Sequence, residues 1–387
     1  MRRPEKLIDD PVRIGQIGLG GGIAPSHLNE MEKNPNFLLA AGCDTRLGDA
    51  AVTKSAQRIR DAGGAIYDTY QQVLADPRVE AVVIAAPHFL HREISVAAFA
   101  AGKHVLCEKP LATHPEDCKI MLEAQRQSGR VGAVQMQHVG RKSMLQMRER
   151  LQAGAIGDIR EVFTATLWWR ENSYYGRVGW AGRKMHNGQW NLDGVMLNQG
   201  IHFINETLVL VTPGKLPTVA EVRDVRSALY RFHDAPQLEM EDTAFVTGML
   251  DVPGSPRLHL VATTCATIDR PTVEIIGTKG RALWNGVGHV FADGQPMEEF
   301  HDDGGEFDGA SLIFNSFAKA VRHGGATMTD FSQIMRTTQF VADAYAAANW
   351  NIKPAPWSEV GSLGGIIAAT QRQRTLPAGL QEKPDWA

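Results

Sequence analysis

Short apolar runs alternate with stretches of helical spacing between residues 12 and 135, and this alternation limits the possible folds more than any other feature. One run, "VEAVVIAAP" at 79–87, is nearly all apolar, as a strand buried on both faces must be. Strands that alternate with helices form a parallel sheet with helices on both faces. The pattern therefore predicts an α/β fold that begins with a Rossmann dinucleotide-binding domain over residues 1–136. The apolar runs lie at 12–18, 37–43, 79–86, 104–107 and 131–137, and the helical stretches at 24–33, 46–62, 91–102 and 115–127.

The rhythm changes after about residue 136. Strand-like runs follow one another at 217–232, 243–250, 257–268, 271–277 and 281–284, without helices between them. That order is typical of an antiparallel sheet with one open face. A strand at 158–170, helices at 142–153, 308–323 and 331–349, helical spacing at 194–211 and a polar loop at 292–310 complete the predicted second domain, 137–350. Residues 351–387, with Pro354, Pro356 and Pro377, are predicted to form an extended C-terminal arm.

The composition excludes several classes of protein. A formal net charge of -3 over 387 residues offers no electrostatic attraction to nucleic acid or to an anionic membrane. The first residues, "MRRPEKLIDDPVRIG", lack the apolar segment of a secretory signal, and no run reaches the length of a membrane span. Four cysteines without CxxC spacing are expected to be reduced thiols: Cys43, Cys107, Cys118 and Cys265. We expect a cytoplasmic protein without nucleic-acid or membrane partners.

A glycine cluster lies between the first strand and the first helix, in "RIGQIGLGGGIAPSH". Glycines there let the backbone approach a pyrophosphate, which sits at the helix N-terminus. The strict G-x-G-x-x-G/A spacing is not met, because the third small residue, Ala24, comes one place late. The position in the first strand–helix unit still favours dinucleotide binding, and the residues expected at the phosphates are Gly18, Gly20, Gly21, Gly22 and Ile23.

Asp44 ends the second strand, and its side chain suggests the choice of cofactor. An acidic residue there hydrogen-bonds the ribose 2′-hydroxyl of NAD and repels a 2′-phosphate. Arg46 could instead accept that phosphate, which leaves NADP as a second possibility. A purely structural alternative is that Asp44 caps the next helix.

Two further strand ends are expected to border the same cleft, since ligands of open α/β sheets lie outside the carboxyl ends of the strands. Pro87, His88 and His91 follow one of these ends. "HVLCEKPLA" at 104–112 places Glu108 and Lys109 at another, with Lys109 aimed at the cleft as a candidate catalytic base. The alternative is a surface ion pair at an ordinary strand end.

The segment "DGVMLNQGIHFIN", 193–205, provides a second candidate pair. Asn198 and His202 are four residues apart and would share a helix face. A structural role for the histidine remains equally open. The preceding loop, 171–192, gathers aromatic and forked-donor side chains that suit a polyhydroxylated ring, or that simply pack the loop: Tyr174, Tyr175, Trp180 and Arg183. No histidine spacing matches a metal site, so we expect no catalytic metal.

These three elements resemble the glucose-fructose oxidoreductase / inositol dehydrogenase / rhizopine-catabolism (Gfo/Idh/MocA) oxidoreductases over residues 11–350. The resemblance implies a Rossmann domain followed by an α/β domain with a large open sheet that forms homodimers or homotetramers, here through the sheet and the arm. It implies catalytic roles for Lys109 and His202, with Asn198 where the family commonly has Asp, and it places Glu108 and Gln137 near the cofactor. Asp193-Gly194-Val195 departs from the family's usual glycine run.

The predicted activity is that of an NAD(P)-dependent dehydrogenase. Its substrate would be a secondary alcohol of a sugar, glycoside, inositol or related cyclic polyol. Lys109, His202, Asn198 and the four loop residues would bind this substrate. Two alternatives stay open: an NAD-dependent glycosidase that oxidises C3 transiently, and a non-enzymatic sensor or repressor on the same fold. A sensor would not need both Lys109 and His202.

Overall fold

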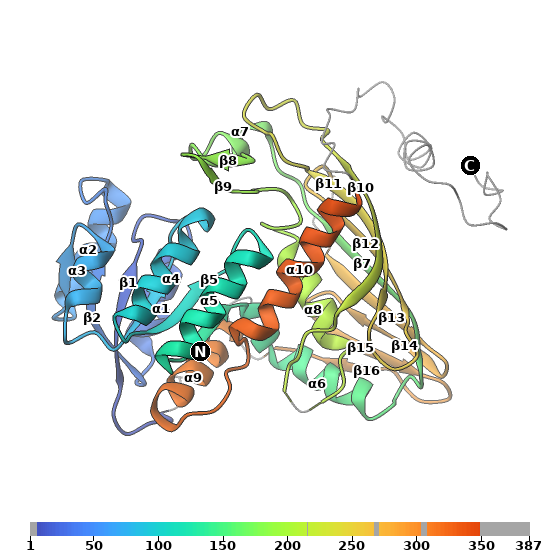
Figure 1. Cartoon of the computed structure of the whole chain (residues 1–387). Helices are drawn as coiled ribbons and strands as arrows, with labels where there is room; N and C mark the ends of the chain where they lie inside the picture. Colours follow the sequence, from blue (N-terminus) through green and yellow to red (C-terminus); the bar gives the residue numbers. More distant parts are fainter. Residues whose placement is uncertain (1–5, 215, 267–270, 303–307, 349–387) are drawn as a thin grey trace.

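The computed structural model describes residues 6–214, 216–266, 271–302 and 308–348. The predicted arm, 351–387, lies outside the described residues. Two sheets organise this part of the chain, and they stand side by side with helix α10 (Phe331–Ala347) between them (Figure 1). Among the described helices, none combines the length and the apolar character that a membrane crossing requires.

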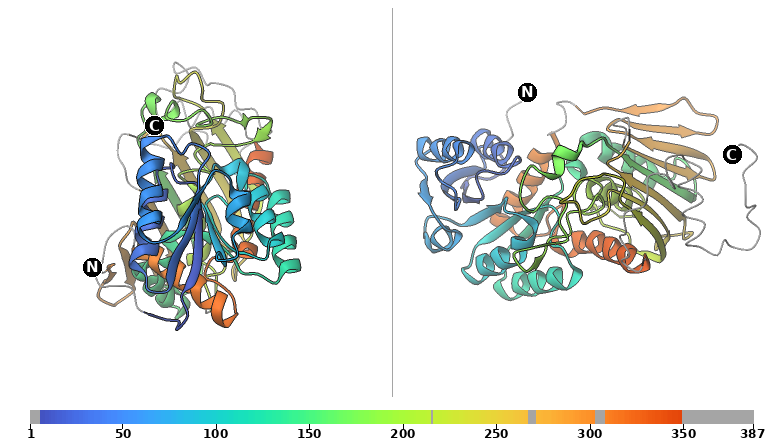
Figure 2. Two further views of the ribbon diagram at one scale, coloured as in Figure 1. Left: turned by 90° about the vertical axis from the view of Figure 1, so that its left-hand side faces the viewer. Right: turned by 90° about the horizontal axis from the view of Figure 1, so that it is seen from above.

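The first sheet is six-stranded and parallel, in the order β3-β2-β1-β4-β5-β6, as expected of a Rossmann domain. Helices cover both of its faces (Figure 2). The edge strand β3 and the short helix α3 were not predicted from the sequence. The elements are β1 (Val12–Ile17), α1 (Ala24–Lys33), β2 (Phe37–Cys43), α2 (Ala50–Asp61), β3 (Ala65–Tyr67), α3 (Tyr70–Ala75), β4 (Ala81–Ile84), α4 (His91–Ala100), β5 (His104–Glu108), α5 (Pro115–Ser128) and β6 (Gly132–Gln135).

Alternate residues of the central strands β4 and β5 enter different cores, which explains why these runs are apolar throughout. In β4, Val83 packs into the core beneath α1 and α2, while Val82 and Ile84 face the core under α4 and α5. In β5, Leu106 and Cys107 divide in the same way. Both faces of the sheet are therefore sealed, and the strand ends are left as the places where polar side chains can act.

The second sheet has eight strands in the order β10-β11-β12-β7-β13-β14-β15-β16, and only the β12–β7 pair is parallel. The predicted mostly antiparallel sheet is confirmed. The predicted polar loop at 292–310 is wrong for residues 298–300, which form the edge strand β16 against β15. The strands are β7 (Ile159–Leu167), β10 (Val222–Tyr230), β11 (Thr243–Leu250), β12 (Arg257–Thr263), β13 (Thr272–Gly277), β14 (Gly280–Trp284), β15 (Gly288–Ala292) and β16 (Glu298–Phe300).

Helices cover one face of this sheet and leave the other open. Along β7 buried and more exposed residues alternate, so one side chain in two turns away from the helices. Phe163 of β7 and Ile276 of β13 are exposed on the open face, and the Phe163 ring stacks on His259 of β12 with centroids 4.7 Å apart. The covering helices are α6 (Lys142–Gln152), α8 (Ile201–Leu210) and α10.

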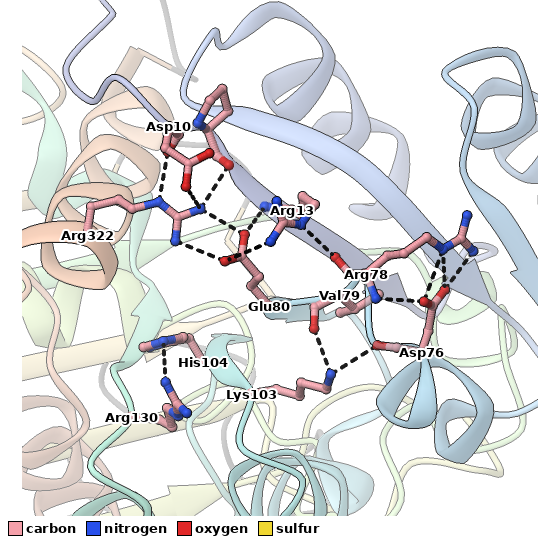
Figure 3. Close-up of polar contacts among 11 residues, drawn as sticks. Asp10, Arg13, Asp76, Arg78, Val79, Glu80, Lys103, His104, Arg130 and Arg322 are labelled. Atoms are coloured by element: carbon pink, nitrogen blue, oxygen red, sulfur yellow. Dashed lines mark hydrogen bonds and ion pairs between the residues drawn. The ribbon is translucent and has the colours of Figure 1, made fainter.

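Helix α9 (Asp308–His323) comes late in the chain but packs on the Rossmann sheet. Its Phe314 meets Phe37 of β2 edge-on at 5.5 Å. Arg322 at its end donates to Pro11 O at 2.9 Å and to Glu80 Oε2 at 2.8 Å (Figure 3). Buried Lys103 donates to the Val79 carbonyl in the same network. These contacts fasten α9 to the edge where the strands begin, opposite the edge that is expected to bind the cofactor.

Candidate active site

The glycine loop between β1 and α1 is shaped by close contacts of its backbone. Gly18 has a φ of +90°, and a Cβ there would lie 2.5 Å from the Ala85 carbonyl oxygen. At Gly20 a Cβ would lie 2.6 Å from Val52 Cγ2, whereas the space around Gly22 is open. Ile23 occupies the N-cap of α1 without a side-chain hydrogen bond. The loop thus presents bare backbone to the start of the helix, the arrangement that accepts a pyrophosphate.

Asp44 follows β2 and closes this loop from the side. Its Oδ2 accepts hydrogen bonds from the Leu19 and Gly20 backbone at 3.0 and 3.1 Å, and its Oδ1 accepts one from Arg46 N at 3.0 Å. The alternative helix-capping role is wrong, because α2 begins at Ala50 with Asp49 at its N-cap. The loop, Asp44 and Arg46 therefore form one unit at the point where β1 lies between β2 and β4. This switch point is where a dinucleotide binds in such sheets, so the residues present fit NAD.

Glu108, at the end of β5, does not pair with the neighbouring lysine's ammonium. Its Oε1 lies 2.8 Å from His27 Nε2 in α1, and its Oε2 accepts the Lys109 backbone N–H at 3.0 Å. Although burial acts the other way, these contacts hold the pKa of Glu108 below its ordinary value. The surface ion pair considered from the sequence is therefore wrong. Glu108 ties β5 to the helix of the phosphate loop.

Lys109, which is joined to the following Pro110 by a cis peptide bond, reaches across to the second domain. Its Nζ donates to Asn198 O at 3.0 Å and to Asn198 Oδ1 at 3.2 Å. Burial lowers the pKa of Lys109, while the charges of Glu108 and Asp193 act against this change. A lysine with a lowered pKa releases a larger neutral fraction near neutral pH and suits general-base chemistry.

The predicted helix over 194–211 is wrong in its first part. Residues 195–200 form turns and α8 begins only at Ile201, so Asn198 precedes the helix that carries His202. The turn is held by Glu241, whose backbone carbonyl and Oε1 accept the N–H groups of Val195 and Met196 at 3.0 and 3.1 Å. Asn198 and His202 therefore do not share a helix face.

His202 is a half-buried histidine whose Nδ1 atom is buried and unused. Within the described residues its Nδ1 has no hydrogen-bond partner. Its ring stacks on His138 with centroids 4.5 Å apart, and His138 in turn contacts the buried carboxylate of Glu206. Burial, helped by the positive charge of Lys109, lowers the pKa of His202 well below its ordinary value. The neutral ring can accept a proton.

Two residues at this site were not predicted. Asp193 is 3% exposed, and its Oδ1 accepts the Asn198 side-chain amide at 2.6 Å. The guanidinium of Arg177 lies 3.7 Å from the ring centroid of Tyr174 and 3.6 Å from Asp193 Oδ2. Arg177 belongs to the loop that the sequence marks as rich in aromatic and arginine side chains, so a signal for it existed. No sequence signal pointed to Asp193, except that it belongs to the Asp-Gly-Val segment that departs from the family's usual glycine run.

The predicted substrate loop divides into two groups. Tyr174 accepts a hydrogen bond from Gln199, next to Asn198. The ring centroids of Trp180 and His88 are 5.2 Å apart. Tyr175 turns away, with its hydroxyl 2.7 Å from Thr264 Oγ1. Arg183 pairs with Glu239 at 2.7 Å. The contacts therefore place Tyr174 and Trp180 beside the candidate site and engage Tyr175 and Arg183 elsewhere.

The remaining predicted residues line the adjoining strand ends. Pro87 precedes the single turn η1 (His88–Leu90), and Gln137 opens η2 (Gln137–Gly140) after β6. His91 is buried, with its ring nitrogens 2.7 and 2.9 Å from the carbonyl oxygens of Pro110 and Ala86. Its contacts join the β4 and β5 ends and leave no nitrogen free for a ligand. His88 Nδ1 and Gln137 Oε1 lack partners within the described residues.

A separate polar cluster at the ends of the second sheet brings together His233, Asp242 and Cys265. Asp242 Oδ2 accepts the backbone N–H groups of Phe232 and His233 at 2.8 and 2.7 Å, and lies 2.9 Å from His233 Nδ1. Although burial opposes it, Asp242 raises the pKa of His233. The carboxylate is thus occupied by the protein's own donors, and the cluster joins β10, β11 and β12.

Two protein-family models match the chain. The first is described as "Oxidoreductase family, NAD-binding Rossmann fold" and covers residues 12–138. The second is the "GFO/IDH/MocA C-terminal domain" and covers residues 144–283. The boundary between the matched regions falls at η2, between the two sheets.

Curated relatives are similar over part of their length. The chain is 28% identical to the D-glucoside 3-dehydrogenase of Escherichia coli (strain K12) over 205 residues, 53% of this chain and 55% of the relative. It is 32% identical to the inositol 2-dehydrogenase of Salmonella typhimurium (strain LT2) over 151 residues, 38% of this chain and 43% of the relative. The chain therefore matches about half the length of these relatives.

Solved structures share the fold at low identity. An inositol dehydrogenase homolog from Azotobacter vinelandii, complexed with NAD+, superposes with a TM-score of 0.77 at 20% identity, covering 91% of this chain and 99% of that one. Levoglucosan dehydrogenase, in complex with NADH and levoglucosan, gives a TM-score of 0.74 at 20% identity, covering 88% and 98%. With both family models matched in order along one chain, the protein belongs to the Gfo/Idh/MocA oxidoreductase family and carries its NAD-binding Rossmann domain.

Proposed function

We propose that the protein is an NAD-dependent dehydrogenase that oxidises a secondary alcohol of a sugar, glycoside, inositol or related cyclic polyol. The observation that carries the proposal is the position of Lys109. Lys109 lies at a strand end of the Rossmann sheet, and its Nζ donates to the backbone oxygen and to Oδ1 of Asn198, in the second domain, at 3.0 and 3.2 Å. His202, whose neutral form is favoured, follows Asn198 in the same segment. This position supports a role for Lys109 as the base beside the strand ends expected to bind the cofactor.

The residues that would hold the cofactor are the glycine loop, Asp44 and the ends of β4 to β6. Gly18, Gly20, Gly21, Gly22 and Ile23 would receive the pyrophosphate, and Asp44 with Arg46 would meet the ribose. Pro87, His88, Glu108 and Gln137 belong to the strand ends beside the nicotinamide. Bound there, NAD would supply the ring carbon that accepts a hydride.

Lys109 and His202 are the candidate proton acceptors for the substrate hydroxyl. Burial lowers the pKa of both side chains and so favours their neutral, basic forms. A positioned base contributes about 10²- to 10⁴-fold to such a step. Asn198 holds Lys109 Nζ in place, so that the base needs little rearrangement when the hydroxyl arrives.

The substrate would lie against Tyr174, Trp180 and Arg177. Aromatic faces pack against the apolar face of a sugar ring, and a guanidinium donates to ring hydroxyls. The names of relatives, a D-glucoside 3-dehydrogenase and inositol 2-dehydrogenases, support cyclic polyols as the substrate class.

We further propose that the open face of the large sheet forms the contact between subunits of a homodimer or homotetramer. Phe163 and Ile276 expose apolar surface at its centre. Exposed apolar patches of this kind mark sites of protein association.

A panel of sugars, glycosides and inositols tested with NAD and NADP, followed by absorbance of the reduced cofactor, tests the activity. Steady formation of NADH with a cyclic polyol is expected. Hydrolysis of a glycoside without net NADH would indicate the glycosidase alternative. Ligand binding without turnover on any substrate would indicate the sensor alternative.

A further inference from the structure

We propose that Asp193 is a positioning residue for proton transfer, which acts on Lys109 through the side chain of Asn198. This inference rests on the dehydrogenase proposed above. It adds a carboxylate at a different position from the Asp that the family commonly has where this chain has Asn198.

The orientation of the Asn198 amide follows from its two neighbours. Asp193 Oδ1 lies 2.6 Å from Asn198 Nδ2, and Asn198 Oδ1 lies 3.2 Å from Lys109 Nζ. A carboxylate only accepts hydrogen bonds and an ammonium only donates them. Asn198 must therefore turn its NH₂ group to Asp193 and its oxygen to Lys109, so that the carboxylate decides which end of the amide meets the base.

Asp193 is itself firmly placed. Its Oδ2 accepts the Gly182 backbone N–H at 2.7 Å and lies 3.6 Å from Arg177 Nη2. Both oxygens thus act as acceptors, the pattern of an ionised carboxylate. Burial raises the pKa of Asp193, while Gly182, Arg177 and Lys109 act against this change.

Other charged or titratable groups also act on Lys109. Glu108, next to Lys109 in the chain, also favours the protonated form of Lys109, while burial lowers the pKa of His88 and His202 and favours their neutral forms. Arg177 adds a positive charge. From the second domain, Asp193 is then the carboxylate that favours the protonated form of Lys109. The groups that face Lys109 are Glu108, His88, His91, Arg177, Asp193 and His202.

The sign of the effect follows directly. A nearby carboxylate raises the pKa of an ammonium group, so its removal lowers the pKa of Lys109. Alcohol oxidation requires the neutral amine. In Asp193→Asn the acid limb of kcat/KM should therefore move to lower pH, by about 0.5 to 1 pH unit for a charge that acts through one intervening amide.

The test measures Lys109 directly as well as the activity. The rate at which acetic anhydride acylates Lys109, followed across pH by mass spectrometry of the peptide that carries it, gives the pKa without cofactor or substrate. Asp193→Asn should lower that pKa. The exchanged variant Asp193→Asn/Asn198→Asp puts the carboxylate in direct contact with Lys109 and should raise the pKa above that of the unmodified protein.

Glu239→Gln is the matched control, since it removes a carboxylate that binds Arg183 and the Lys184 backbone but not Asn198. It should leave the pKa of Lys109 unchanged. If Asp193→Asn does not fold, the exchanged variant decides alone: a pKa at or below that of the unmodified protein overturns the proposal. An unchanged pKa in a folded Asp193→Asn also overturns it. Failure of the proposed dehydrogenase would appear separately, as no formation of NADH by the unmodified protein with any substrate of the panel.

Discussion

His27 and Glu108 join helix α1 to the end of strand β5 through a buried contact, with His27 Nε2 2.8 Å from Glu108 Oε1. The same carboxylate accepts the backbone N–H of Lys109. One side chain thus links the helix behind the phosphate loop to the strand that carries the candidate base. A substitution of Glu108 should therefore affect both the binding of the cofactor and the proton transfer by Lys109.

Glu108→Gln keeps the shape of the side chain but removes its charge. We expect the free energy of unfolding, from urea denaturation followed by tryptophan fluorescence, to fall by about 1–3 kcal/mol. Since the pKa of Glu108 is held below its ordinary value of 4.5, this stabilisation is complete above that pH and lost as pH falls through the folded-state pKa. Glu116→Gln, at an exposed position in α5, is the control. Equal stability of Glu108→Gln and the unmodified protein at pH 7 would contradict the structural role.

Lys109→Met keeps the length of the stem and removes the amine. Turnover should fall by at least about 10²-fold, the contribution of a lost general base. NADH binding, measured by fluorescence titration, should change little, since the phosphate loop and Asp44 are untouched. Lys119→Met, at an exposed lysine of α5, should behave like the unmodified protein. Near-normal turnover in Lys109→Met would refute the catalytic assignment.

Asp44→Ser should shift the choice of cofactor. The change removes the charge that repels a 2′-phosphate and frees Arg46, whose Nε lies 3.5 Å from Asp44 Oδ1. The ratio of kcat/KM for NADP to that for NAD should rise at least about tenfold, as for the loss of about 1.4 kcal/mol of discrimination. The ratio is the proper readout, because the lost hydrogen bonds to Leu19 and Gly20 weaken both cofactors. Asp61→Ser, at the exposed end of α2, is the control, since Asp61 accepts a hydrogen bond from Gln57 and not from Arg46. An unchanged ratio in Asp44→Ser would show that Asp44 does not bind the ribose.

Phe163→Asp should lower the assembly state. The substitution places a charge on the open sheet face, where burial of an unpaired carboxylate against a second subunit costs several kcal/mol. The molar mass from light scattering should fall toward that of one chain. Leu38→Asp, which changes a comparably exposed apolar side chain on β2 of the Rossmann sheet, should leave the mass unchanged. An unaltered mass for Phe163→Asp would place the subunit contact elsewhere.

The sequence by itself determined the fold class, because the relevant signals are local. Uninterrupted apolar runs report strands buried on both faces, and the helical stretches between them require a parallel sheet. The same local logic placed Lys109 at a strand end and the glycine loop at a strand–helix junction. Chain direction then put both at one edge of the sheet.

Local sequence patterns gave wrong predictions where backbone groups form hydrogen bonds with residues distant in the sequence. Residues 194–200 have helical spacing, but the N–H groups of Val195 and Met196 donate to Glu241, which is distant in the sequence. Helix α8 therefore begins only at Ile201. The sequence predicts a loop where β16 lies, because a strand of three residues has too little pattern to be recognised. This strand forms by pairing with β15.

Only the tertiary structure decided which side chains meet. Tyr174 and Tyr175 are adjacent, yet one reaches Gln199 beside the site and the other turns to Thr264. Asp193 contacts Asn198, which in turn contacts Lys109 about ninety residues away in the chain, and no periodicity within either segment encodes these contacts. The sequence specifies which chemical groups stand at the ends of elements. Their partners depend on long-range packing, which sets the burial and charge that tune Lys109.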